Sequence, residues 1–456
     1  MNYISTRGNA PELSFSDVLL TGLASDGGLY VPTNWPTLPP LGNDYAETAT
    51  SIMSAYIGDD IPHDVLARLV SDAYATFRHP AIAPLVQIDD DLWIQELFHG
   101  PTLAFKDLAL QVVGRLFDHV LAERNERVTI VGATSGDTGS AAIDAVKACD
   151  NVDIVILYPH GRTSEVQRRQ MTTVDSSNVH AVAIDGTFDD CQDLVKAMFA
   201  DEQLRRDCNL SAVNSINWAR VMAQIVYYVT ASQSLAGSST FCVPTGNFGN
   251  VLAGWIARST GASIDHLLIA SNANDILSRF VNDRDMSAAA VVPTLSPSMD
   301  IQVSSNFERL LFEMNDRDGG LTAEQLQRFR STGKLEVEED GFHQWISSTF
   351  SAERVDDEQT LSEIGRVYRE TGMLIDPHTA TGTAAARRQA REGATVCLST
   401  AHPAKFPDAV ERATGIRPEL PSALGDLMER TEHITRLSSD LADVSAFVRQ
   451  VSRVGR

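Results

Sequence analysis

The feature that most constrains the fold is a regular alternation of strand and helix patterns between residues 91 and 270. Short runs of β-branched and apolar residues are each followed by a segment whose apolar residues recur at helical spacing. The predicted strands are 92–96, 128–131, 152–158, 180–184, 240–243 and 266–270, and the predicted helices are 107–124, 164–172, 188–199 and 251–258. Alternation of this kind predicts an α/β fold with largely parallel sheets.

The regions on either side carry weaker patterns. Residues 1–90 contain few residue types suited to chemistry, apart from Arg7, so we expect an architectural cap with helices at 45–57 and 62–77. Beyond residue 275 the patterns predict, in chain order, a helix at 352–370, a short strand and turn before a helix at 374–383, a strand at 395–399 and closing helices at 417–456. The chemistry is therefore expected in the alternating region.

Composition narrows the possible functions. The 456 residues suffice for about two or three domains. A net charge of −23 argues against a nucleic-acid or anionic-membrane partner, because either would require a basic face. The five cysteines never show Cys-x-x-Cys spacing, which favours reduced thiols over disulfides or zinc. With no secretory signal, no apolar run of membrane-spanning length and no histidine pair at metal-ligand spacing, we expect a cytoplasmic protein without a metal site.

Lys106 is the first candidate for chemistry. The chain has only five lysines against 32 arginines, so most basic positions carry a side chain that cannot act as a nucleophilic amine. Lys106 follows the loop 99–105 and precedes an apolar helix pattern. Desolvation there would favour the neutral amine that attacks a carbonyl, whereas a lysine at a helix start can also extend to water. This segment alone leaves both interpretations open.

The glycine-rich turn at 246–250 lies between a predicted strand and a predicted helix. Glycines allow several backbone N–H groups to converge, and the helix start adds positive potential, so the turn suits a phosphate. It matches neither a P-loop nor the dinucleotide-binding pattern, and a tight turn without a ligand remains the alternative. The residues concerned are Gly246, Asn247, Phe248, Gly249 and Asn250.

Three further segments resemble anion sites at strand ends or helix starts. The turn 134–140 contains several hydroxyls that could hold a carboxylate or phosphate, or could simply cap a helix. Asn214 and Ser215 are candidate caps of the next helix, and Arg220, about one turn along, is easier to explain with an anion nearby than without one. Thr400 ends a predicted strand. Together with Lys106 and the 246–250 turn, these features suggest a phosphorylated aldehyde cofactor held as a Schiff base and an anionic substrate.

With these segments the chain resembles the threonine synthases, a family of fold-type-II pyridoxal-phosphate (PLP) enzymes. The resemblance runs nearly end to end and is greatest to the longer subgroup, whose chains begin with Tyr-x-Ser-Thr-Arg-Gly. The matching motifs are Tyr3-Ile-Ser-Thr-Arg-Gly8, Gly22-Leu-Ala-Ser-Asp-Gly-Gly-Leu-Tyr-Val-Pro32, the Lys106 segment, residues 132–140 and 244–250, and Leu398-Ser-Thr-Ala-His-Pro-Ala-Lys-Phe406. Several such motifs in the same order are highly specific.

The resemblance implies a domain organisation like that of the tryptophan synthase β chain, with two open parallel-rich sheets flanked by helices plus an N-terminal cap. It divides the chain into an N-terminal cap domain, a large PLP-binding α/β domain, a small mobile α/β domain and a C-terminal helical extension, at residues 1–90, 91–127 with 223–415, 128–222 and 416–456 respectively.

The resemblance also implies roles for individual residues. Lys106 would form the Schiff base with PLP and act as acid and base. Thr400 would face the pyridine nitrogen, and Asp137 would lie near the 3′-oxygen of the cofactor, where relatives often have asparagine. The cofactor phosphate would be bound by Gly246, Asn247, Phe248, Gly249 and Asn250. The substrate's carboxylate and phosphate would be bound by Thr134, Ser135, Thr138, Asn214, Ser215 and Arg220.

The implied reaction converts O-phospho-L-homoserine and water into L-threonine and phosphate, by γ-elimination and addition of water at the β-carbon. The implied partner is that small substrate, and the implied assembly a monomer or a homodimer. Two alternatives remain at this stage. One is a related PLP lyase that forms no threonine, and the other is a metabolite-binding homologue without catalysis.

Overall fold

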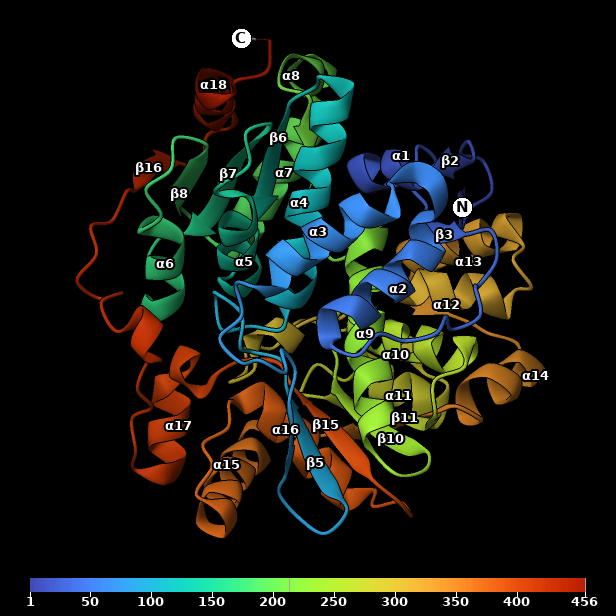
Figure 1. Cartoon of the computed structure of the whole chain (residues 1–456). Helices are drawn as coiled ribbons and strands as arrows, with labels where there is room; N and C mark the ends of the chain where they lie inside the picture. Colours follow the sequence, from blue (N-terminus) through green and yellow to red (C-terminus); the bar gives the residue numbers. More distant parts are fainter. Residues whose placement is uncertain (213, 456) are drawn as a thin grey trace.

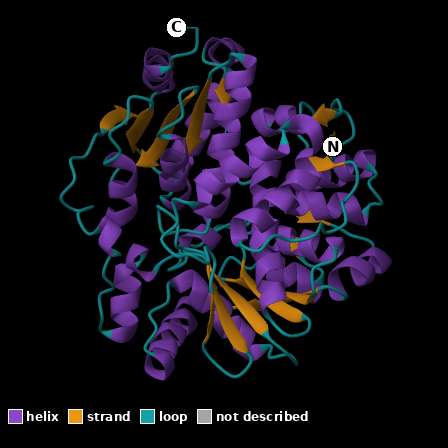
Figure 2. Ribbon diagram, in the orientation of Figure 1, coloured by secondary structure: helices purple, strands orange, loops and turns teal. Residues whose placement is uncertain are grey.

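The core of the protein is built on two separate sheets (Figures 1 and 2). The computed structural model describes residues 1–212 and 214–455. The larger sheet has six strands, all parallel except for the antiparallel β4 at one edge. Its strands, in spatial order, are β14 (Phe350–Arg354), β11 (Ile264–Ser271), β10 (Ser239–Pro244), β15 (Thr395–Ser399), β5 (Leu92–Glu96) and β4 (Leu85–Gln87).

The smaller sheet has five parallel strands, in the order β16 (Thr435–Ser438), β8 (Val179–Asp185), β7 (Val152–Pro159), β6 (Val128–Ala133) and β9 (Leu210–Ser211). All eight residues of β7 are buried. This explains its continuous apolar run, since a central parallel strand is covered on both faces. The helices that belong to this sheet are α5 (Asp137–Val146), α6 (Glu165–Thr172), α7 (Phe188–Ala200), α8 (Glu202–Asp207) and α18 (Leu441–Val451). The strand–helix alternation of the sequence is therefore confirmed.

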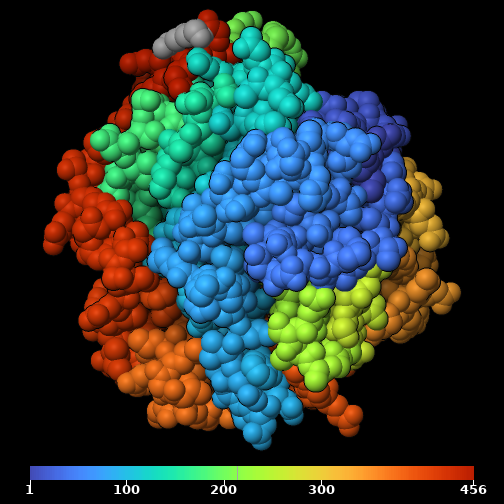
Figure 3. All heavy atoms as spheres, viewed as in Figure 1, coloured from blue at the N-terminus to red at the C-terminus, as the bar shows by residue number. Residues whose placement is uncertain are grey.

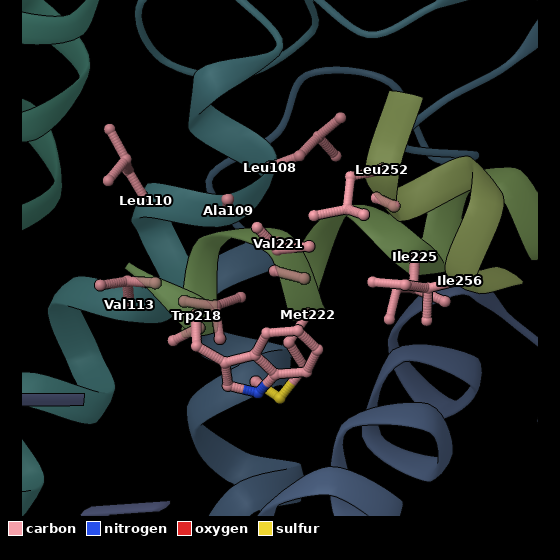
Figure 4. Close-up of a cluster of buried hydrophobic side chains, with 14 of the residues drawn as sticks. Leu108, Ala109, Leu110, Val113, Trp218, Val221, Met222, Ile225, Leu252 and Ile256 are labelled. Carbon is pink, nitrogen blue, oxygen red and sulfur yellow. The ribbon is translucent and has the colours of Figure 1, made fainter. Parts of the chain in front are cut away.

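Three buried helices pack against one another in the interior: α4 (Lys106–Arg124), α9 (Trp218–Ser234) and α10 (Gly249–Thr260). Figure 4 shows their apolar side chains in contact, among them Leu108, Trp218 and Leu252. Gly114 lets α4 approach α5 closely, because a Cβ at this position would lie 2.5 Å from the carbonyl oxygen of Ala145. This packing fixes the start of each helix, and functional side chains were predicted at all three starts.

The N-terminal unit forms one side of the molecule (Figure 3). Its small antiparallel sheet contains β2 (Leu13–Ser14), β1 (Asn2–Ser5) and β3 (Tyr30–Pro32), and its helices are α1 (Phe15–Thr21), α2 (Tyr45–Ile57) and α3 (His63–Tyr74), with the short turn η1 (Gly58–Asp60). The rings of Tyr3 and Tyr56 lie 5.9 and 5.6 Å from the ring of Trp218 at the start of α9. The unit is thus anchored on a helix of the interior, and its two expected longer helices are present.

The remaining elements complete the larger layer. They are α11 (Ile276–Asp283), β12 (Met286–Ser287), η2 (Pro297–Met299), α12 (Phe307–Met314), α13 (Gly319–Thr332), β13 (Lys334–Leu335), α14 (Glu339–Phe342), η3 (His343–Ser347), α15 (Asp357–Thr371), α16 (Pro377–Arg388), η4 (Pro403–Lys405), α17 (Pro407–Thr414) and η5 (Ser422–Leu424). Among the described residues, no helix combines the length and the apolar character needed to cross a membrane.

Three expectations for the C-terminal half are wrong in detail. Residues 352–354 continue β14 instead of starting a helix, because pairing with β11 outweighs their local helical pattern. No strand precedes α16, whose start is capped by Asp376. Residues 417–456 are not purely helical, because 435–438 form β16, which pairs with the exposed edge of β8. The C-terminal segment is therefore part of the smaller sheet.

Candidate active site

Lys106 is the first residue of α4, and its amine lies inside the protein. Its side chain is 9% exposed. Nζ lies 3.3 Å from Oδ2 of Asp137 and 3.5 Å from Oγ of Ser298. Burial lowers the pKa of Lys106 below its ordinary value; Asp137 opposes this shift, and the charges of Lys405 and Arg220 add to it. The local environment therefore favours the neutral amine that a nucleophile or base requires.

Asp137, the first residue of α5, is the anion that faces Lys106. Its Oδ1 lies 2.7 Å from Nζ of Lys405 and accepts a hydrogen bond of 2.9 Å from Nε2 of Gln167. Burial alone would raise the pKa of Asp137, but the charges of Lys405 and Lys106 and its hydrogen bonds hold that pKa well below its ordinary value. The N-terminus of a helix also favours a carboxylate. Asp137 is therefore ionised and holds two lysines at once.

The turn between β10 and α10 presents backbone N–H groups to the site. Phe248 has a φ of +63°, which sharpens the turn. Oγ of Ser304 donates to the carbonyl oxygen of Gly246 at 2.6 Å, and Nδ2 of Asn306 donates to that of Asn247 at 3.2 Å. Since both carbonyl oxygens bond on this side, the N–H groups of the following peptides face the other way. The first N–H groups of α10 also have no acceptor within the helix, so the turn fits a phosphate.

Asn250, the last residue of this turn, has a fixed amide with one unused donor. Its Oδ1 accepts hydrogen bonds from the hydroxyls of Tyr227 and Tyr228 at 2.6 and 2.9 Å. In the described part of the chain its Nδ2 is buried and has no partner. A buried donor without a partner is costly, so the amide nitrogen is suited to a ligand acceptor.

The turn between β6 and α5 is shaped by Thr134. Its Oγ1 accepts hydrogen bonds from the backbone N–H groups of Gly136 and Gly139 at 3.0 and 2.9 Å. Ser135 is exposed and Thr138 is half-buried in the first turn of α5. The hydroxyl of Thr134 is thus engaged in the turn itself, and Ser135 and Thr138 are its more accessible hydroxyls.

The loop before α9 differs from expectation in one respect. Neither Asn214 nor Ser215 caps the helix; the N-cap is Asn217, whose side chain accepts a hydrogen bond of 3.0 Å from the N–H of Ala219. Asn214 and Ser215 are half-buried in the preceding loop. The helix therefore begins later than predicted, and Arg220 lies in its first turn.

Arg220 is a buried cation with unused donors. The residue is 4% exposed. Within residues 1–212 and 214–455, its Nε and Nη1 are buried and have no hydrogen-bond partner. Burial lowers its pKa to about 10. A buried guanidinium near the positive end of a helix is unfavourable on its own, so this position fits the binding of an anion.

Thr400 lies directly after β15 and is joined to the Lys106 segment through the backbone. Its carbonyl oxygen accepts a hydrogen bond of 2.8 Å from the N–H of Phe105, and Ala401 bridges to Ala104. Thr400 is buried. The structure therefore brings the predicted lysine and the predicted hydroxyl to neighbouring positions at one edge of the larger sheet.

Three residues of this site were not predicted from the sequence: Lys405, Gln167 and Ser298. Lys405 is fully buried, and its Nζ also donates to the carbonyl oxygen of Thr102 at 2.8 Å. It could have been noticed as another of the five lysines, inside a motif already singled out. Gln167 and Ser298 belong to segments without any distinctive pattern, so no local signal marked them.

Comparison with known proteins decides the family. Residues 2–74 match the family model for the threonine synthase N terminus, residues 76–342 that for pyridoxal-phosphate-dependent enzymes, and residues 379–448 that for the threonine synthase C-terminal region. A threonine synthase of Pseudomonas aeruginosa is 53% identical over 470 aligned residues, which cover 100% of both chains. The chain belongs to the threonine synthase family.

Solved structures of threonine synthases agree in fold over the whole chain. The PLP-bound threonine synthase from Brucella melitensis superposes with a TM-score of 0.97 at 50% identity and 100% coverage of both chains. The threonine synthase from yeast has a TM-score of 0.93 at 38% identity, covering 99% of this chain and 98% of that one. The protein is thus a PLP-dependent enzyme with the expected fold.

The residues present fit that cofactor. A buried lysine can bind the aldehyde, and the turn 246–250 offers N–H groups to a phosphate. The unpartnered amide of Asn250 and the unpartnered guanidinium of Arg220 both await acceptors. Cation, anion and donor groups thus occur where a phosphorylated aldehyde and an anionic substrate would need them.

Proposed function

We propose that this threonine synthase family member converts O-phospho-L-homoserine and water into L-threonine and inorganic phosphate. The observation that carries the proposal is Arg220, a buried guanidinium with two unused nitrogens whose charge is felt at Lys106. Only an anionic substrate would satisfy these donors. A substrate with both a carboxylate and a phosphate also matches the number of anion sites.

Lys106 is the residue we propose to hold PLP covalently and then to move protons. Bound PLP supplies an electron sink that makes the α- and β-protons of an amino acid removable. Once replaced by the substrate's amine, Nζ of Lys106 is free to accept the proton from Cα and then that from Cβ. Its lowered pKa supports this role, because the base must be neutral near working pH.

The remaining predicted residues would bind and orient. The N–H groups of 246–250 and Nδ2 of Asn250 would hold the cofactor phosphate, and Thr400 would face the ring nitrogen. Asp137 is placed by Lys405 and Gln167 close to Lys106, where it would lie beside the 3′-oxygen. Arg220 would stabilise the phosphate that leaves from Cγ, with Ser135 and Thr138 as further donors and Asn214 and Ser215 lining the same side.

We further propose the division into four parts already set out, with residues 128–222 as a small domain that moves against the larger one. Lys106 and Thr400 belong to the larger part, and Asp137 and Arg220 to the smaller. Closure of one part on the other would complete the site and exclude stray water.

The experiment that tests this function is product identification. Purified protein saturated with PLP is incubated with O-phosphohomoserine, and phosphate, threonine and 2-oxobutyrate are each quantified. Equal amounts of phosphate and threonine are expected. Phosphate with 2-oxobutyrate as the main product would instead indicate a lyase without threonine synthesis, and no phosphate release would reject both.

A further inference from the structure

The start of α12 lies between two loops of the proposed site and contacts both. Nδ2 of Asn306 donates to the carbonyl oxygen of Ser215 at 3.0 Å and to that of Asn247 at 3.2 Å, and the backbone N–H of Asn306 also donates to Asn247. One side chain therefore joins the loop before α9 to the turn before α10. Asn306 is fully buried, so water does not compete for these bonds.

The orientation of the Asn306 amide is set by Arg309. Nη1 of Arg309 donates to Oδ1 of Asn306 at 2.5 Å, which turns Nδ2 toward the two loops. Asn306 is the N-cap of α12, yet its side chain makes no capping hydrogen bond. Asparagine at an N-cap usually accepts from its own helix. Here that local role is given up for contacts outside the helix.

Arg309 itself is a buried cation held by oxygens of other segments. It is 1% exposed, and burial lowers its pKa to about 9. Nε donates to the carbonyl oxygen of Tyr30 in the N-terminal unit at 3.0 Å, and Nη2 donates to that of Ile216 at 2.7 Å. The neighbouring Glu308 is bound by Arg7. Arg309 thus attracts carbonyl oxygens from two other parts of the chain.

We propose that Asn306, oriented by Arg309, is a positioning residue that fixes the cofactor-phosphate turn and the substrate-anion loop relative to each other. By holding the carbonyl oxygens of Ser215 and Asn247, it turns the N–H group that follows Asn247 toward the cofactor phosphate and sets the loop that leads to Arg220. The inference rests on the proposed function for the identity of the second ligand. It also gives the N-terminal unit a role, since Tyr30 anchors Arg309 from behind.

The chain offers a matched comparison. Ser304 lies close by and bonds only the cofactor-phosphate turn, through the carbonyl oxygen of Gly246. Ser304→Ala should therefore weaken PLP binding alone, whereas Asn306→Ala should weaken two ligands. Asn306→Asp has the same shape and keeps an acceptor for Arg309, but it presents a carboxylate oxygen to two carbonyl oxygens. It separates loss of positioning from loss of folding.

Binding measurements test the inference without relying on turnover. PLP is titrated into the cofactor-free protein and followed by visible absorbance, and inorganic phosphate is titrated calorimetrically into PLP-saturated protein. For Asn306→Ala and Asn306→Asp, both dissociation constants should rise by about tenfold or more, in line with the loss of buried hydrogen bonds. For Ser304→Ala only the PLP constant should rise.

Thermal unfolding of the same samples excludes trivial loss of structure, because Asn306→Asp should melt near the wild-type temperature. The inference is overturned if Asn306→Asp folds and leaves either constant unchanged, or if Ser304→Ala weakens both ligands equally. A wild-type protein that binds PLP and phosphate but makes no threonine would reject the proposed reaction while leaving this inference intact.

Discussion

Nζ of Lys405 lies 2.7 Å from Oδ1 of Asp137, and the other oxygen of the same carboxylate faces Lys106. Lys405 comes from the segment after β15 of the larger sheet, and Asp137 from the helix after β6 of the smaller sheet. This buried contact therefore joins the two sheets at the proposed site. It also places a second positive charge near Lys106, which contributes to the lowered pKa of that amine.

Lys405→Met should destabilise the protein and change Lys106. Removing one partner of a buried ion pair costs about 3 kcal/mol, whereas Lys147→Met, which breaks an exposed pair with Asp144, should cost less than about 1 kcal/mol. The pKa of Lys106 should rise, because a nearby cation is lost. Urea unfolding measures the first effect, and the pH dependence of turnover, shifted to higher pH, measures the second. Equal losses of stability in the two variants would contradict this account.

Lys106→Ala should abolish turnover and covalent cofactor binding. No other amine lies where PLP could bind without displacing the Asp137–Lys405 contact, so we expect no rescue by Lys405. Borohydride reduction followed by peptide mass analysis should find the adduct on Lys106 in the wild-type protein and none in the variant. An adduct on another lysine, or near-normal turnover, would reject the assignment.

Arg220→Met should separate stability from activity. The guanidinium is buried with unused donors, so its removal relieves an unfavourable charge and the free energy of unfolding should stay the same or rise. The catalytic efficiency kcat/KM should fall by about 10²- to 10³-fold, as for loss of one charge-stabilising donor. Arg220→Lys keeps the charge and should fall between the two. A variant that loses both stability and activity would indicate a structural role.

His402 predicts a pH dependence of stability. Burial lowers its pKa from 6.5 to about 4 in the folded protein, with Arg78 and His99 acting in the same direction. The unfolded chain therefore binds a proton between these values that the folded protein does not, and stability falls as the pH decreases from about 6.5 to about 4. His402→Asn keeps a capping group for the N–H of Ala404. Its melting temperature should drop less than that of the wild type between pH 7 and pH 4.5, and an equal drop would contradict the prediction.

Closure of the small domain can be followed by hydrogen exchange. With PLP and a non-reactive phosphonate analogue of the substrate, amides in residues 128–222 that lie near the site should become more protected, because closure excludes water. Amides in α2 and α3 of the N-terminal unit should change little and serve as the internal reference. The same protection with and without the analogue would count against closure.

The sequence could predict those features that are encoded locally. Strands such as β7 are apolar throughout because they are covered on both faces, and the turn at 246–250 needs its glycines to bend. Lys106 was recognisable because lysines are rare in this chain. Such features depend on residues close together in the sequence, so periodicity and turn chemistry are enough to find them.

Contacts between distant segments could not be predicted in this way. The Asp137–Lys405 and Asn306–Ser215 contacts arise only when separate elements pack together, and nothing in the neighbouring residues encodes them. The strand at 350–354 was missed for the same reason, since its pairing with β11 is a tertiary effect. Asn217, rather than Asn214, caps α9 because the N-terminal unit holds its side chain at Leu19.

Strand β16 has a consequence for handling the protein. It covers the edge of β8, a strand about 250 residues earlier in the chain, and Arg436 bonds Asp185 across that edge. A truncation before residue 435 would leave β8 with a row of open N–H and C=O groups flanked by apolar side chains, which is a template for aggregation. Purification tags are therefore safer at the N-terminal end, and loss of solubility in a shortened form would reflect an uncovered sheet edge rather than damage to the site.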